Sequence, residues 1–281
     1  MIKKISIVAL ILLLVGIVGS IFTFKSINTA KDVTEEKVEI QDAFDEIEIS
    51  SNEARVEVLP TSDSKATIEL TGKHSNYRLS ADVEASTLKV DVGYRQNKLF
   101  NFDFTSALLT LKVYVPEKLY QSLQIESGNG RVQVDDLQAK NVYVKTDNGH
   151  IKLNNLESSK VTAEADNGTI DLKNVASSAV NTRADNGKIH LDNVEGNLSG
   201  KTNNGSISLV THDLDRAIDF ETDNGKIKIQ TEKDPTNVIF DIKLDNGKAD
   251  IFGKTNWDTV IGDGEHLIKL TAGNGKITVT K

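Results

Sequence analysis

The sequence predicts an all-β protein: a parallel β-solenoid, similar to a β-helix, with an N-terminal β cap and one preceding transmembrane helix. Three observations predict this fold class. An Asn-Gly pair recurs about every 19 residues from residue 129 onward. Apolar and polar residues alternate on both sides of each pair, and an uncharged apolar run stands near the N-terminus. A fixed period near 20 residues is typical of repeat architectures.

The Asn-Gly pairs are separated by 19, 19, 19, 18, 20, 22 and 28 residues. Asn and Gly tolerate positive φ better than other residues, so each pair is expected to form a structural turn. The eight pairs are Asn129-Gly130, Asn148-Gly149, Asn167-Gly168, Asn186-Gly187, Asn204-Gly205, Asn224-Gly225, Asn246-Gly247 and Asn274-Gly275.

The flanks of each pair predict two strands per repeat. Apolar side chains stand two and four residues after each glycine, as in Ile151 and Leu153, and five and seven residues before it, as in Val144 and Val142. Such alternation with period 2 indicates half-buried strands. The residue three before each glycine is usually small, as at Thr146, which indicates that the interior narrows beside the turn.

Two folds share this local pattern. In an antiparallel meander each Asn-Gly pair would be a type I′ hairpin turn, whereas in a solenoid it would be a corner, with equivalent residues stacked about 4.8 Å apart. A flat meander would expose one apolar face, and the sequence offers no amphipathic helices to cover it. A second series, Asn155, Asn174 and Asn193, marks an opposite corner and favours the solenoid. A sandwich of stacked hairpins is the alternative.

The N-terminus predicts the compartment. Lys3 and Lys4 precede residues 5–24, which carry no charge and as a helix would span roughly 30 Å, the thickness of the hydrocarbon layer. We therefore expect residues 1–4 in the cytoplasm and a single-pass signal anchor in the cell membrane. The C-terminal domain is then extracytoplasmic. Cleavage after a signal peptide is the alternative, although Val18-Gly19-Ser20 is a poor site.

The remaining segments are assigned by their regularity. Residues 25–40 show no apolar period and are expected to be a solvated stalk. Residues 41–122 contain longer, less regular strands and are expected to cap the solenoid, which spans residues 123–281, because repeat proteins protect their open ends with atypical units. The irregular stretch 252–264, with Trp257, is the candidate for closing the other end.

Composition excludes several function classes. The formal charge of −8 argues against nucleic-acid binding, which needs a concentrated basic face. The absence of cysteine excludes disulfides, thiolate metal sites and a cysteine nucleophile. No metal and no cofactor is predicted.

One stretch of motifs resembles a known family. Val113-Tyr114-Val115-Pro116 is followed by Leu123 to Gly130 and then by iterated Thr/Ala-Asp-Asn-Gly-x-Ile-x-Leu segments. This arrangement resembles the bacterial "putative adhesin" β-strand-repeat family, a domain of unknown function grouped with pectate-lyase-like β-helices. With its anchor and no cysteine, the chain also resembles LiaG-like membrane proteins of bacillar envelope-stress operons. The resemblance implies surface association and a link to envelope stress, but no catalytic residue.

The sharpest candidate site is the aspartate row, defined as the acidic residues directly before five of the asparagines: Asp147, Asp166, Asp185, Asp223 and Asp245. Stacked carboxylates about 5 Å apart repel, so a cation or a wall polymer could relieve them. The favoured interpretation is structural: each Asp accepts backbone N–H bonds in an Asx turn, and Lys188, Lys226 and Lys248 offset the charge.

Other candidates are interpreted structurally. The five histidines show no metal-ligand spacing, and the stripe of Phe100, Phe102 and Phe104 is typical of a core or an end cap. A glycosidase needs two carboxylates in one cleft, and no repeat unit departs from the pattern to form one. The sequence thus favours a non-catalytic envelope protein that contacts a cell-wall polymer, a membrane component or an envelope protein. The alternative is a β-helix carbohydrate-active enzyme.

Overall fold

The computed structural model describes residues 34–72, 77–94, 109–254 and 260–281. These residues form an all-β protein, as predicted, with fourteen strands and no helix. In this part of the chain no helix is long and apolar enough to cross a membrane. The expected anchor, residues 5–24, lies outside the described residues, as do Trp257 and the phenylalanine stripe.

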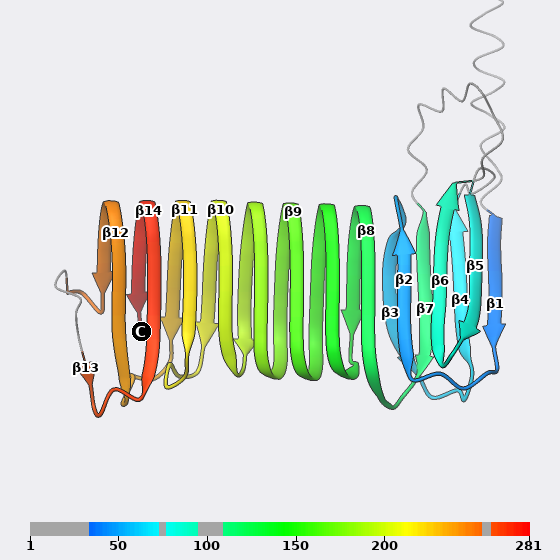
Figure 1. Ribbon diagram of the computed structural model, residues 1–281, viewed down its shortest axis with the longest axis horizontal. Coiled ribbons are helices and arrows are strands. Elements are labelled where there is room, and N and C mark those ends of the chain that lie inside the picture. Colours follow the sequence, from blue (N-terminus) through cyan, green and yellow to red (C-terminus); the bar gives the residue numbers. More distant parts are fainter. Residues whose placement is uncertain (1–33, 73–76, 95–108, 255–259) are drawn as a thin grey trace, which may run out of the picture.

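The repeat region is a row of stacked coils (Figure 1). Each coil rises in one sheet, turns at its Asn-Gly corner and descends in a second sheet. The strands that form the coils are β8 (Leu119–Asp135), β9 (Gln138–Val194), β10 (Asn197–Thr211), β11 (Ile218–Thr231), β12 (Val238–Ile251) and β14 (His266–Thr280). Neighbouring coils pair in parallel with equivalent residues opposite one another, such as Asn129 and Asn148. Parallel pairing is the solenoid arrangement, not that of stacked hairpins.

The last three coils do not stack in chain order. β14 lies between β11 and β12 and pairs in parallel with both. β12 is therefore the last full coil, and the short β13 (Val260–Ile261) pairs antiparallel with its beginning. Phe252, within the stretch expected to close this end, packs edge-on against Phe240 of β12, with ring centroids 6.3 Å apart.

Because β14 stacks between β11 and β12, the segments that lead into these three strands must pass one another, and hydrogen bonds hold them together. Asp215, in the loop before β11, accepts bonds from the backbone N–H groups of Thr236 and Asn237 at 2.9 and 3.0 Å and from the Thr236 hydroxyl at 2.5 Å. The Asn237 side chain accepts a bond from the N–H of Glu265 at 3.0 Å. One cluster thus joins the segments that enter β11, β12 and β14.

The N-terminal strands continue both sheets and then reverse direction. They are β1 (Thr34–Ile40), β2 (Glu46–Ser51), β3 (Arg55–Thr61), β4 (Ala66–Gly72), β5 (Tyr77–Glu84), β6 (Thr87–Tyr94) and β7 (Thr110–Pro116). β2 and β3 form a coil parallel to β8, and β6 and β7 pair in parallel with β2 and β3. Antiparallel β5 and β4 follow at the outer side, and β1 pairs with β4. These outer strands cap the stack.

β1 corrects one expectation. The sequence predicts that residues 34–40 belong to the solvated stalk, because residues 25–40 show no periodic apolar pattern. In the structure they form a strand whose register runs from Thr34 opposite Gly72 to Ile40 opposite Ala66. The strand forms because β4 offers it a free edge and Ile40 is buried, a partner that the local sequence does not reveal.

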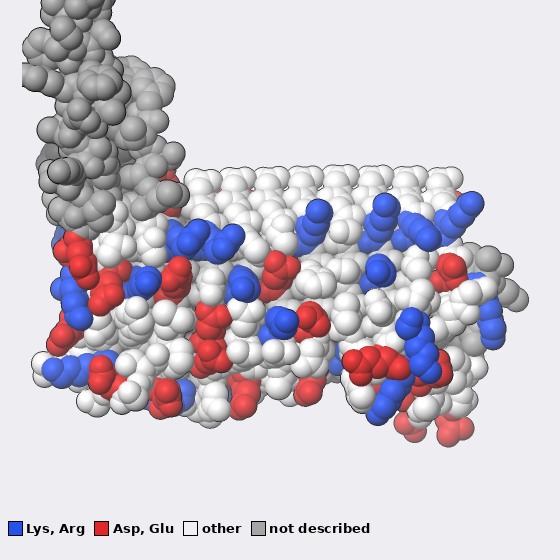
Figure 2. Space-filling view, turned by 180° about the vertical axis from the view of Figure 1, so that it is seen from behind, with Lys and Arg blue, Asp and Glu red and all other residues white. Residues whose placement is uncertain are grey.

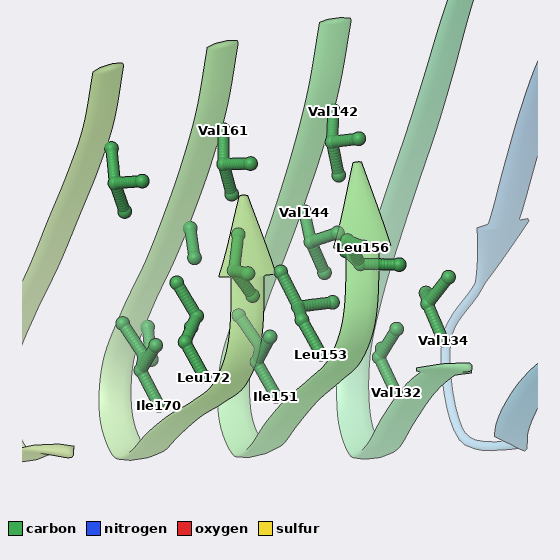
Figure 3. Close-up of a cluster of buried hydrophobic side chains, with 14 of the residues drawn as sticks. Val132, Val134, Val142, Val144, Ile151, Leu153, Leu156, Val161, Ile170 and Leu172 are labelled. Carbon is green, nitrogen blue, oxygen red and sulfur yellow. The ribbon is translucent and has the colours of Figure 1, made fainter. Parts of the chain in front are cut away.

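The core fills the space between the two sheets. Inward side chains at equivalent positions of successive coils, such as Val132, Ile151 and Ile170, lie side by side along the stack (Figure 3), and these residues together with Val144 and Val161 are 0% exposed. Small or hydroxylated residues stand inward beside the Asn-Gly corner, as predicted, with Thr146, Thr202 and Thr222 at 1% exposure or less. The outward positions of the same strands are polar, so each sheet presents a regular array of side chains to solvent.

Candidate functional site

An asparagine ladder runs along the first corner of the solenoid. It consists, in spatial order, of Asn129, Asn148, Asn167, Asn186, Asn204, Asn224, Asn274 and Asn246. Each amide nitrogen Nδ2 donates to the Oδ1 of the preceding asparagine, at 2.9 to 3.2 Å. These bonds fix the register of the coils, since each inner asparagine is bonded to one asparagine on either side and the end members, Asn129 and Asn246, are bonded to one each.

The glycines of the pairs serve close approach between coils. A Cβ at Gly168 would lie 1.9 Å from the carbonyl oxygen of Gly149, and at Gly187 it would lie 1.8 Å from that of Gly168. None of the eight asparagines has positive φ, and of the glycines only Gly130, Gly247 and Gly275 do. The reason for glycine thus differs from the expected one: at most corners it is the missing side chain, not an unusual φ.

The opposite corner follows the expected series. Asn155, Asn174 and Asn193 have φ of 53°, 52° and 53°, the left-handed region that Asn tolerates better than most residues. Asn174 donates to Asn155 and Asn193 to Asn174, each at 3.0 Å, and Asn155 donates to Asp136 at 2.8 Å. Positive φ therefore builds this second corner.

The aspartate row lies beside the asparagine ladder. Asp147, Asp166, Asp223 and Asp245 are exposed and make no hydrogen bond or ion pair with any described residue. Asp185 pairs with Arg183, with 3.0 Å between Nη2 and Oδ1. The expected Asx bonds to backbone N–H groups are thus not formed by the side chains of the described row.

The spatial order of the coils divides the aspartate row. Asp147, Asp166 and Asp185 belong to successive coils of β9, and Asn203 then interrupts them. Gly273 of β14 stands between Asp223 and Asp245, as its contact with the Asp223 carbonyl shows. Among the described residues no group of three or more His, Asp or Glu side chains is placed to hold a metal ion. Cation binding by the row stays a prediction.

A row of lysines lies on the other side of the same corner. We define the lysine row as Lys188, Lys226, Lys276 and Lys248, each directly after a corner glycine. All four are exposed. The sequence alone indicates Lys188, Lys226 and Lys248 but not Lys276, which the order of the coils places between Lys226 and Lys248. The Gly-Lys repeat was the available signal, and the insertion of β14 is what makes these lysines neighbours.

Three of the described histidines each contact one polar side chain of a neighbouring coil. His150 contacts Asp171 at 2.5 Å, His190 contacts Ser208 at 2.8 Å, and His212 contacts Glu232 at 2.7 Å. These pairs join neighbouring coils on the outer surface. His74 lies outside the described residues. The contacts explain these side chains as surface links between coils.

A hollow of about 420 Å³ lies where the cap meets the first repeats, lined by Pro60, Glu117, Lys118, Asp136, Leu137 and Gln138. It contains two carboxyl groups, as a glycosidase would need. However, Asp136 already accepts the Asn155 amide, and the Lys118 ammonium binds Asp45 at 3.0 Å and the Phe44 carbonyl. These groups hold the end of the stack together.

Two pKa shifts mark structural groups. Burial raises the pKa of Tyr120, and the charge of Asp45 raises it further; the hydroxyl donates to the Pro116 carbonyl at 2.7 Å. For Asp215, desolvation raises the pKa, but the hydrogen bonds from Thr236 and Asn237 and the charge of His266 outweigh it, so the pKa is lowered. Both groups fix chain segments at the ends of the stack.

Comparisons with known proteins agree with the resemblance seen in the sequence. The family model described as Toastrack DUF4097 matches residues 44–280. A solved structure of a "putative adhesin" from Parabacteroides distasonis is similar over 88% of this chain and 97% of that chain, at 14% identity and a TM-score of 0.52. Another, from Parabacteroides merdae, covers 89% and 97% at 12% identity and a TM-score of 0.50. No curated protein matches. At these identities the likeness shows the fold.

Proposed function

This chain belongs to the Toastrack DUF4097 family, and from that premise we propose that it is a non-catalytic binding or scaffolding protein of the bacterial cell envelope. Its β domain lies outside the cytoplasm, and residues 5–24 hold it in the cell membrane. The uncharged run and the two lysines before it support the anchor and its orientation.

The regular outer surface is the observation that carries the proposal. Outward polar side chains recur at equivalent positions from coil to coil, so the rod offers a repeated contact to a repeated partner. Catalysis of glycoside hydrolysis instead requires two carboxyl groups around one scissile bond. In the hollow beside the cap, the Asp136 carboxyl is engaged by Asn155.

The solved structures of this fold are consistent with binding. The two reported structures are each described as a "putative adhesin". A rod of stacked coils suits attachment because many weak contacts along one partner add up to firm binding. A cell-wall polymer or an envelope protein is the partner class that we propose. A link to envelope stress is part of the proposal, and an unchanged stress reporter after deletion of the chain would remove it.

Binding and turnover can be separated in one experiment. The full-length chain in phosphatidylcholine nanodiscs is incubated with purified cell-wall polysaccharides, and retained polymer and released sugar are measured together. The proposal predicts retained polymer and no sugar release above that of empty nanodiscs. Release over many turnovers would establish the carbohydrate-active enzyme instead.

A further inference from the structure

The lysine row brings like charges into register. Lys276 lies opposite Lys226 on one side and opposite Lys248 on the other, so three ammonium groups extend from three successive strands about 4.8 Å apart. Lys188 continues the row beyond Ser206, which pairs with both Lys188 and Lys226. Like charges directly opposite one another on a sheet are destabilising, so this arrangement has a cost in the free protein.

The row is not neutralised by the protein. None of its four lysines makes an ion pair or hydrogen bond with a described residue. By contrast, two lysines at other outward positions of this part of the stack are paired, Lys201 with Glu221 at 2.7 Å and Lys269 with Asp219 at 3.2 Å, whereas the exposed Lys228 of β11 is, like the row, unpaired among the described residues. Charge pairing between coils is thus available in this fold, and the row lacks it.

The nearest carboxylates do not cover the lysine row on the sheet face from which its side chains extend. Asp223 and Asp245 lie before the corner asparagines, with Gly273 between them, and so flank the row from the other side of the corner. Asp250, two residues after Lys248, accepts the N–H of Gly253 at 2.8 Å. Figure 2 shows the basic side chains following one another below the corner rim toward the C-terminal coils.

We propose that the lysine row binds a phosphodiester polymer that lies along the solenoid axis. This inference rests on the proposed envelope function and names its ligand class. Ammonium groups bind phosphates as point charges, and the Ser206 hydroxyl can donate between two of them.

The position of the row favours a polymer over the headgroups of the anchoring membrane. β1, which follows the expected anchor in sequence, is at the opposite end of the stack from β11, β14 and β12 (Figure 1). At about 4.8 Å per strand, the row reaches its densest part roughly 40 Å along the axis. An axial row of charges also matches a chain better than a planar surface.

The dependence of binding affinity on salt concentration measures how many lysines contact phosphates of the polymer. The full-length chain in phosphatidylcholine nanodiscs is titrated with poly(glycerol phosphate) at 50 and 200 mM salt. A single-stranded polyanion loses about 0.7 log unit of affinity per log unit of salt for each contact. Four contacts therefore predict a roughly 50-fold fall over this range, and a variant with only Lys188 left should fall about 2.6-fold.

Matched variants separate the row from overall charge. K226Q/K276Q/K248Q removes the three adjacent lysines, and K243Q/K269Q/K281Q removes the same charge from lysines that are paired with Asp241, Asp219 and Asp234. We expect the first variant to lose more than tenfold at 50 mM salt and the second less than threefold. K226R/K276R/K248R, which keeps the charge, should bind within threefold of the original chain, and circular dichroism verifies the fold of each.

Several outcomes would overturn the proposal. Equal losses in the first two variants would show a general charge effect, and equal binding of poly-glutamate would remove the phosphate preference. Competition by vesicles of equal parts phosphatidylglycerol and phosphatidylcholine, as strong per phosphate as the polymer, would assign the row to lipid. If all variants retained another cell-wall polymer equally, the lysine row would not be the binding site, but the proposed binding function would stand. Release of sugar would refute the proposed function itself.

Discussion

Gly168→Ala tests the packing of the corner most sharply. The new Cβ would lie 1.9 Å from the carbonyl oxygen of Gly149, 2.9 Å from its carbonyl carbon and 3.1 Å from its nitrogen. All three atoms belong to the backbone of the neighbouring coil, so no side-chain rotation relieves the contact. The coils must separate locally by more than an ångström.

The expected loss of stability follows from the packing and the hydrogen bonds that this separation of the coils disturbs. Overpacking of a rigid site costs about 1–3 kcal/mol, and two lost backbone hydrogen bonds add about 1–3 kcal/mol. We expect a loss of roughly 2–6 kcal/mol in the free energy of unfolding, against a total that is typically about 5–15 kcal/mol. Gly93→Ala is the control, because its Cβ would meet the flexible carboxylate of Asp91 at 3.1 Å.

Guanidinium unfolding followed by circular dichroism measures both variants. The account predicts a much lower midpoint for Gly168→Ala and a change below about 1 kcal/mol for Gly93→Ala. If the two variants were equally stable, close approach between coils would not be the reason for the corner glycines, and the explanation given for them would be wrong.

Three further predictions concern the ladder, the crossing and the last coils. Asn167→Ala removes one bond to Asn148 and one from Asn186; because exposed partners regain water, we expect a loss of about 1 kcal/mol, and no change in the midpoint would contradict the ladder's role. Because folding lowers the pKa of Asp215, its carboxylate stabilises the folded state at pH values above the unfolded-state pKa, which is near 3.9. This stabilisation is lost as the pH falls through the folded-state pKa. The difference in unfolding free energy between the original chain and Asp215→Ala should therefore shrink from pH 6 to pH 3, and a constant difference would refute the linkage. Deletion of residues 266–281 should expose backbone N–H groups of both β11 and β12 to hydrogen exchange, whereas a simple terminal coil would leave one neighbour unchanged.

The sequence predicts the coil but not the order of all the coils. Period-2 alternation and the two asparagine series identify the strands and both corners, since these features depend on residues close in the chain. The coils at 218–231, 238–251 and 266–280 carry the same pattern, so any stacking order satisfies it. The observed order is held by long-range bonds, such as that of Asp215 to the segment before β12.

The candidate site, too, can be predicted from the sequence only where it does not depend on the stacking order of the coils. The aspartates and three of the lysines follow from the repeat, but the adjacency of Lys276 to Lys226 and Lys248 depends on the insertion of β14. The sequence predicts the corner glycines from their tolerance of positive φ, which applies at few of the corners, because local conformational preference does not reveal a clash with a neighbouring coil. β1 was missed for a related reason: its partner lies 26 or more residues away in the chain.

Cysteine cross-linking tests the stacking order directly, and the chain contains no native cysteine to interfere. Pairs of cysteines replace Lys226 and Lys276, Lys276 and Lys248, or Lys226 and Lys248. Adjacent strands place Cα atoms about 4.8 Å apart, within the range that a disulfide spans, whereas strands two apart exceed it. We expect rapid oxidation of the first two pairs and no oxidation of the third. Cross-linking of the third pair alone would place β11 beside β12 and contradict the lysine row.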